Sequence, residues 1–105
     1  MRRGQIYSCD LGPPLGHEAG FRRPALIVSP ELINRFGTPI VLPITRTPRG
    51  YATHVELDGV LDAVSYIQCE LIRAVASDRL LRYVAAAPPD TLARVDSILR
   101  RILVL

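Results

Sequence analysis

The segment between residues 12 and 23 concentrates side chains that could carry acid–base chemistry. It holds His17, Glu18, Arg22 and Arg23 within seven positions. A histidine titrates near neutral pH and can act as a general acid or base, and a neighbouring carboxylate can hold a proton. An arginine can stabilise the charge on a pentacoordinate phosphate. A solvated polar loop that uses its glycines for turns would have the same composition, so both interpretations stay open.

A second basic segment begins where an expected strand ends at Thr45. Arg46, Arg49 and Tyr51 follow it in a loop that also contains a proline and a glycine. Arginines with an interleaved aromatic ring suit single-stranded nucleic acid, because guanidinium groups meet phosphates while bases stack on rings. The alternative is a mobile, charged surface loop.

The remaining reactive side chains have structural explanations. Glu70 and Arg73 follow a strand, where a structural salt bridge is the usual reason for such a pair. His54 alternates within a strand and is predicted to lie on the sheet surface. Cys9 and Cys69 lack CxxC spacing and are predicted to be buried, reduced thiols. The histidines and cysteines also lack metal-ligand spacing, so neither a metal site nor a cofactor is predicted.

These segments are connected by short strands that turn signals separate. Strands are expected at residues 5–10, 25–28, 40–44, 53–57, 65–69 and 83–86. Ala25–Val28 is a continuous apolar run, which is typical of a strand buried on both faces. Pro43 indicates an edge or bulged strand, because proline cannot donate to a ladder.

The C-terminal end changes to the period of an amphipathic helix, with Pro89 in its first turn. The stripe that should face the core consists of Leu92, Val95, Leu99, Ile102 and Leu103. No helices are expected between the strands, so the pattern fits a compact, partly open barrel better than βαβ units.

Length and composition exclude several classes of protein. The 105 residues make one domain, residues 1–105. The longest apolar stretches fall far short of the ~20 residues of a membrane span, and no signal peptide is recognisable. We therefore expect a cytoplasmic protein without membrane contact. The net charge is only +3, but all 13 basic residues are arginine. Codon usage could explain that bias, and so could bidentate phosphate recognition.

Several short motifs occur in an order that resembles the MazF/PemK (Kid) family of toxins. The motifs are Arg3–Tyr7, Gly16–Glu18, Arg23–Ser29, Asn34–Phe36, Leu42–Thr45, Thr53–Leu57, Glu70–Arg73 and Ser77–Leu80. Any one of them is weak evidence, but the ordered set is specific. Together with the final helix it covers nearly the whole chain.

The resemblance implies a mainly β fold with a C-terminal helix, built as a small SH3-like barrel. It implies a homodimeric, metal-independent endoribonuclease that acts as the toxin of a type II toxin–antitoxin pair. Such toxins cut single-stranded RNA (messenger, transfer or ribosomal) at short motifs and leave a 2′,3′-cyclic phosphate and a 5′-hydroxyl. A MazE-like antitoxin is then the expected partner, with an acidic tail that would occupy the RNA groove.

The same resemblance suggests the roles of individual residues. Arg23 matches the catalytic arginine of the family's R-P motif, and Thr45 matches the threonine that closes its P-I-T motif. His17 matches the histidine of Kid-like members, and Glu18 matches the acidic residue after it.

One position departs from the Kid-like pattern. Glu70 takes the place of a functional aspartate, but Gln68 stands where those toxins carry an arginine. The division of roles among the catalytic candidates is therefore open. The candidates for lining the RNA groove are Arg22, Arg46, Arg49, Tyr51 and Arg73.

Two other functions remain open from the sequence. A non-enzymatic gyrase inhibitor of the CcdB type shares this barrel, so the fold alone does not exclude it. A catalytically inactive nucleic-acid-binding relative is the other alternative. The pairing of Arg23 with Thr45 in its motif context favours the ribonuclease, because an inhibitor of gyrase would not need it.

Overall fold

The computed structural model describes residues 1–105. Seven strands, two α-helices and two 3₁₀ turns follow one another as β1 (Gln5–Asp10), β2 (Arg22–Ile27), α1 (Glu31–Arg35), β3 (Ile40–Thr45), β4 (His54–Leu57), β5 (Ser65–Gln68), η1 (Cys69–Leu71), β6 (Arg73–Ala74), η2 (Ser77–Arg79), β7 (Leu80–Ala86) and α2 (Pro89–Leu103). None of the helices has the length and apolar character that crossing a membrane would require.

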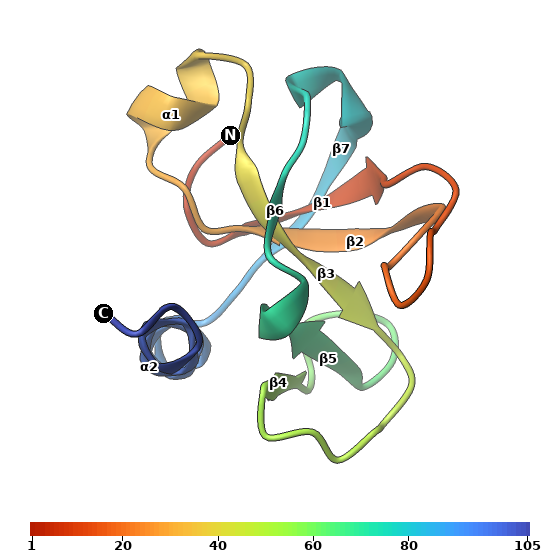
Figure 1. Ribbon diagram of the computed structural model, residues 1–105, viewed down its shortest axis with the longest axis vertical. Helices are drawn as coiled ribbons and strands as arrows, with labels where there is room; N and C mark the ends of the chain where they lie inside the picture. The colour runs from red at the N-terminus through yellow and green to blue at the C-terminus, as the bar shows by residue number, and fades with distance from the viewer.

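The strands form one antiparallel sheet in the order β4-β5-β3-β2-β1-β7, and β6 pairs with β3 beside this path. The sheet curls on itself into a small open barrel, with α2 packed against one side (Figure 1). The expected mainly β fold with a C-terminal helix is confirmed. The six expected strands are present, β1 with the predicted ends and the other five with shifted ends, whereas α1 and β6 were not predicted.

Strand β2 is the centre of the packing. Ala25, Leu26 and Ile27 are fully buried. Leu26 belongs to the core cluster that α2 covers, while Ala25 and Ile27 belong to a second cluster on the other side of the strand. The apolar run therefore predicted correctly that this strand is buried on both faces.

Pro43 does not mark a sheet edge, because β3 lies between β2 and β5. The prediction of an edge strand is wrong, and the reason is a change of partner along β3. Ile40 and Val41 pair with β6, whereas Ile44 and Thr45 pair with β5. Pro43 lies between these two ladders, where the N–H that proline lacks is not needed.

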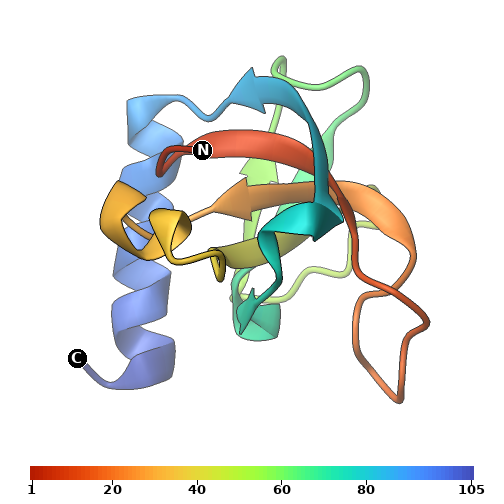
Figure 2. The ribbon, with the colours of Figure 1, turned by 90° about the horizontal axis from the view of Figure 1, so that it is seen from above.

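Helix α2 closes one side of the barrel, as Figure 2 shows. Pro89 occupies the first turn, and Val95 is fully buried in the core. Arg3 forms an ion pair with Asp96 that ties the N-terminal segment to the helix. Leu103 departs from the predicted stripe, because it is 47% exposed near the end of the helix.

The loop between β1 and β2 projects from the side of the molecule opposite α2 (Figure 2). Two backbone hydrogen bonds close its root, from Leu11 N to Phe21 O at 2.9 Å and from Phe21 N to Gly12 O at 2.6 Å. Gly20 is required inside the loop, since a Cβ atom there would lie 2.7 Å from Pro14 Cγ. The loop is therefore held at both its root and its turn.

Gly4 → Ala tests the contact between the N-terminal segment and α2. Gly4 has φ +93°, and an added Cβ would lie 2.9 Å from Leu92 Cδ1. We expect the free energy of unfolding to fall by about 1–2 kcal/mol from backbone strain and by about 1–3 kcal/mol more from overpacking. Urea denaturation measures the sum of the strain and overpacking costs.

Gly59 → Ala is the matched control. Gly59 also has positive φ (+73°), but nothing lies within 4 Å of an added Cβ. This substitution should show the backbone cost alone, about 1–2 kcal/mol. Equal losses in the two variants would contradict close packing of Gly4 against the helix.

Candidate functional site

The register of β2 on its neighbours sets the position of Arg23. On one side Arg23 pairs with Cys9 of β1. On the other side the ladder between β2 and β3 ends at the pair Ala25–Pro43, and Arg23 and Thr45 lie two residues beyond it on their strands, where both line one cavity. Two residues that are 22 positions apart in the sequence are thereby brought to the same end of adjacent strands.

The Arg23 side chain is anchored at only one of its nitrogens. Its Nε donates to the carbonyl oxygen of Gly20 at 3.1 Å. The two terminal nitrogens have no protein partner, so the planar end of the guanidinium is free for a ligand. The side chain is partly buried, which strengthens its interaction with an anion.

Arg23 lines two adjoining cavities. The first, here called the Thr45 cavity, has a volume of about 450 Å³ and is lined by Ser8, Arg22, Arg23, Pro24, Ile44, Thr45, Arg46, Val60, Leu61, Asp62, Ser65, Arg82 and Val84. The second, the His17 cavity, has a volume of about 480 Å³ and is lined by Gly16, His17, Glu18, Ala19, Arg23, Arg49, Tyr51, Gln68, Glu70 and Leu71. Arg23 is the one residue common to both linings.

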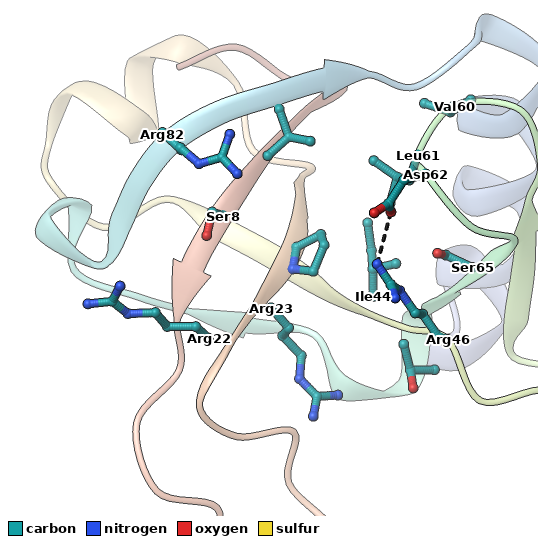
Figure 3. A pocket seen from close by; sticks show the side chains of 13 residues that line it. Ser8, Arg22, Arg23, Ile44, Arg46, Val60, Leu61, Asp62, Ser65 and Arg82 are labelled. Atoms are coloured by element: carbon teal, nitrogen blue, oxygen red, sulfur yellow. Dashed lines mark hydrogen bonds and ion pairs between the residues drawn. The ribbon is translucent and has the colours of Figure 1, made fainter.

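The Thr45 cavity combines hydroxyl groups with arginines, as Figure 3 shows. The Thr45 hydroxyl oxygen accepts a hydrogen bond from Thr47 N at 3.2 Å, which leaves its own proton free to donate to a ligand. Across the cavity, Arg46 forms an ion pair with Asp62 at 2.9 Å. Both partners are largely exposed, so this pair is weak and a phosphate can compete for Arg46.

The His17 cavity presents a histidine whose ring has no hydrogen-bond partner. His17 and Glu18 are both exposed in the β1–β2 loop. Glu18 is tied back to the loop, because its Oε1 accepts from Leu15 N at 2.9 Å. The imidazole of His17 therefore remains available for proton transfer with a ligand in this cavity.

Glu70 lies on the wall of the His17 cavity and pairs with His54. The turn η1 brings Glu70 back over β4, where its Oε2 lies 2.9 Å from His54 Nε2 and its Oε1 accepts from Thr53 Oγ1 at 2.9 Å. The His54 side chain is only 3% exposed, so its predicted place on the sheet surface is wrong. The expected salt bridge between Glu70 and Arg73 is not formed either.

Partial burial acts to raise the pKa of Glu70, but hydrogen bonds outweigh it. The hydrogen bonds come from His54, from the backbone and from Thr53, and together they lower the pKa of Glu70 below its ordinary value. The neighbouring thiol behaves in the opposite way, because burial and the charge of Glu70 raise the pKa of Cys69 to about 12. Cys69 is free and buried as predicted, and it stays protonated near neutral pH.

The two cavities gather all but one of the residues that the sequence pointed to. Arg22 and Arg46 join the Thr45 cavity, while Arg49 and Tyr51 join the His17 cavity. Arg73 lines neither, since it lies on β6 with its Nη1 3.4 Å from Leu11 O. The cavity residues that sequence reasoning did not select are Ser8, Asp62, Ser65 and Arg82.

His54 and Thr53 were also missed as partners of Glu70, although one signal pointed to them. Val55 and Leu57 are buried in the core, so alternation places His54 on the other side of β4. What the sequence does not show is the η1 turn that covers this side.

The arrangement suits anionic, phosphate-bearing ligands. An arginine fork, a threonine hydroxyl and a histidine ring converge on adjoining cavities. No three His, Cys, Asp or Glu side chains come together as a protein-built metal site would require. The groups present can stabilise a phosphate charge, donate to its oxygens and move a proton.

Comparison with known proteins identifies relatives along the whole chain. The profile of the PemK-like, MazF-like toxins of type II toxin–antitoxin systems matches residues 2–103. Endoribonuclease MazF9 of Mycobacterium tuberculosis is 34% identical over an alignment of 110 positions, which covers 95% of this chain and 93% of that protein.

Solved structures show the same fold. A crystal structure of MazF from Deinococcus radiodurans matches with a TM-score of 0.90 and 30% identity, covering all of this chain and 97% of that one. A mycobacterial endoribonuclease in complex with its cognate antitoxin matches with a TM-score of 0.84 and 28% identity, covering all of this chain and 96% of that one.

Proposed function

Because this chain belongs to the family of PemK-like and MazF-like toxins of type II toxin–antitoxin systems, we propose that it is an endoribonuclease that cleaves RNA at the two cavities joined by Arg23. The resemblance found in the sequence motifs is confirmed. The observation that carries the proposal is the free guanidinium end of Arg23, which lines both the cavity that contains Thr45 and the cavity that contains His17.

The reaction that fits these groups uses the 2′-hydroxyl of RNA as the nucleophile. This oxygen attacks the adjacent phosphorus and loses its proton, and the bond to the 5′-oxygen breaks as that oxygen takes up a proton. The products are a 2′,3′-cyclic phosphate and a 5′-hydroxyl. The protein has to remove one proton, deliver another and stabilise the pentacoordinate phosphate between these steps.

Arg23 and Thr45 act on the phosphate. The free end of the Arg23 guanidinium contacts the non-bridging oxygens, on which negative charge grows in the transition state. The Thr45 hydroxyl, which already accepts from Thr47 N, donates its proton to one of these oxygens. Neither step needs a metal ion.

His17 exchanges protons with the substrate. Its imidazole lies in the cavity next to Arg23 without a partner of its own, so it can take the proton of the 2′-hydroxyl. Glu18 and Glu70 line the same cavity.

A single RNA strand fits across both cavities. Arg22 and Arg46 would contact phosphates on one side of Arg23, and Arg49 would do so on the other. Tyr51 is 55% exposed, which leaves its ring free for base stacking. The acidic tail of a MazE-like antitoxin would compete for the same arginines; the solved complex of a related endoribonuclease with its antitoxin supports such a partner.

We propose a two-fold dimer through strand β7, which is the edge strand beside β1. Leu81 and Tyr83 expose 45% and 49% of their surfaces there, and the Thr45 cavity reaches this strand at Arg82. A second copy would cover these apolar groups and border the cavity.

We also propose that the protein acts in the cytoplasm, where RNA is present and the two buried thiols stay reduced. Cell fractionation that recovers the chain elsewhere would contradict this.

Sedimentation equilibrium at micromolar concentration tests the dimer. We expect twice the mass of the chain for the wild type and a monomer for Leu81 → Asp, because the substitution puts a charge into the proposed interface. Leu32 → Asp is the control, since Leu32 is 58% exposed on α1, a different element. A monomeric wild type would contradict the proposed assembly.

Arg23 → Ala tests the catalytic centre. A long single-stranded RNA is incubated in EDTA with the purified chain, and the ends of the fragments are mapped. The wild type should leave cyclic phosphate ends, and Arg23 → Ala should cut about 10²–10³-fold more slowly because the charge on the transition state is no longer stabilised. Arg35 → Ala, an exposed arginine on α1, should cut at the wild-type rate.

Three outcomes would count against this mechanism. Loss of wild-type cleavage in EDTA would show that a metal is needed. Cleavage of an oligonucleotide with a 2′-deoxy sugar at the cut site would exclude the 2′-hydroxyl as nucleophile. Growth arrest that survives Arg23 → Ala while cellular RNA stays intact would favour a gyrase inhibitor of the CcdB type instead.

Charge reversal of Arg46 and Arg49 tests the path of the strand. The double substitution to glutamate should weaken binding of a single-stranded oligonucleotide and of the antitoxin's acidic tail alike. The negative slope of log K against log salt for the oligonucleotide should become less steep, by about 0.7 for each phosphate that the protein no longer neutralises. Arg35 → Glu on α1 controls for net charge, and unchanged affinity for both ligands would remove this loop from the proposed groove.

A further inference from the structure

Both carboxylate oxygens of Glu70 are held by neighbours on β4 and the residue before it. His54 Nε2 lies 2.9 Å from Oε2, and Thr53 Oγ1 donates to Oε1 at 2.9 Å. The Glu70 side chain is 31% exposed and faces the His17 cavity, whereas His54 is 3% exposed beneath it. The carboxylate therefore has a fixed orientation, with one face toward the cavity.

His54 has no function apparent in the structure other than this contact. Its second ring nitrogen, Nδ1, is buried and has no hydrogen-bond partner. An ionised Glu70 only accepts hydrogen bonds, so the proton of His54 has to lie on Nε2 and point at Oε2. A buried polar ring with one unsatisfied nitrogen is costly, and a purely structural position would be filled by an apolar side chain.

The geometry leaves Glu70 with capacity to accept further hydrogen bonds. Each carboxylate oxygen can accept two, so an acceptor position remains beside the donors His54, Thr53 and the backbone. Tyr51 lies beside the pair, with its ring centroid 5.1 Å from that of His54 and an interplanar angle of 62°. The exposed face of this tyrosine offers a stacking surface next to the free acceptor positions of Glu70.

We propose that His54 is a positioning residue that holds Glu70 as a fixed, ionised acceptor for the N–H groups of a nucleobase stacked on Tyr51. This inference rests on the proposed function, because the ligand is a base of the bound RNA. It assigns Glu70 to recognition of the base and leaves proton transfer to His17. A carboxylate already engaged by His54, Thr53 and the backbone is a weak base, and hydrogen bonding that keeps it ionised suits an acceptor.

Several charged or titratable groups surround the pair. Across the His17 cavity and in η1 they are His17, Glu18, Arg23, Arg49, Tyr51 and Cys69. On the other side of His54, a smaller cavity against α2 contains Glu56, Arg94 and Arg101. Thr53 and the backbone would still donate to Glu70 without His54, so removal of His54 should raise the pKa of Glu70 without keeping it protonated at neutral pH.

The test compares His54 → Leu with His54 → Gln, since glutamine keeps an amide N–H that can reach Oε2. Cleavage of a short RNA is followed between pH 5 and pH 9. We expect His54 → Leu to raise KM about tenfold, which is about 1.4 kcal/mol, and to change kcat less than twofold. The acid limb of kcat/KM should move to higher pH, because Glu70 then takes up a proton more readily. His54 → Gln should restore most of the loss.

A double-substitution cycle separates positioning from a general structural role. If His54 acts through Glu70, adding His54 → Leu to Glu70 → Gln should leave KM unchanged. Additive losses, an unchanged KM in His54 → Leu, or a loss confined to kcat would overturn the inference. Should His54 → Leu fail to fold, Thr53 → Val removes the donor to Oε1 instead and should shift KM and the acid limb in the same direction.

The outcomes for this inference and for the proposed function are distinct. A wild-type chain that cuts no RNA removes the proposed function, and the role of His54 with it. Wild-type cleavage that Arg23 → Ala abolishes, combined with an unchanged KM in His54 → Leu, removes only the role of His54. Binding of an uncleavable 2′-deoxy oligonucleotide provides a second readout, in which His54 → Leu should also weaken affinity about tenfold.

Discussion

The antiparallel pairing of β2 with β3 is the constraint on which the rest of the site depends. Both faces of β2 are buried by different parts of the core, so a shift of register by one residue would exchange the two faces and disrupt both clusters. The same register brings Arg23 and Thr45, each two residues beyond the pair Ala25–Pro43, to one cavity. Core packing, rather than any contact within the site, therefore holds the strands that carry the two residues proposed to act on phosphate.

The charged side chains that line the two cavities differ in whether they have partners. The chain has a net charge of only +3, and two of its carboxylates already have partners at the cavities, Asp62 on Arg46 and Glu70 on His54. The terminal nitrogens of Arg23 have no anionic partner, and Arg23 alone lines both cavities. A modest total charge can thus coexist with a strong local attraction for phosphate.

Much of this could be predicted from the sequence, because local patterns determine it. The apolar run of β2, the period of α2 and the turn residues predict a barrel closed by one helix. Ordered motifs predicted Arg23, Thr45 and His17 at the cavities. What escaped prediction depends on contacts between distant segments. Pro43 is tolerated in an interior strand only because β3 changes partner there. His54 lies under Glu70 because the turn η1 folds over β4, and strand alternation does not reveal which segment covers a face.

The closed root of the β1–β2 loop isolates the ends of the two strands from changes in the outer part of the loop. Hydrogen bonds between Leu11, Gly12 and Phe21 complete the ladder just before Arg23, so substitutions farther out in the loop leave the strand ends where they are. Residues at the loop surface other than His17 and Glu18 can then change while Arg23 keeps its place. Changes in the outer part of the loop are thus limited by Gly20 and His17, and the two hydrogen bonds at its root keep them from reaching the strand that carries Arg23.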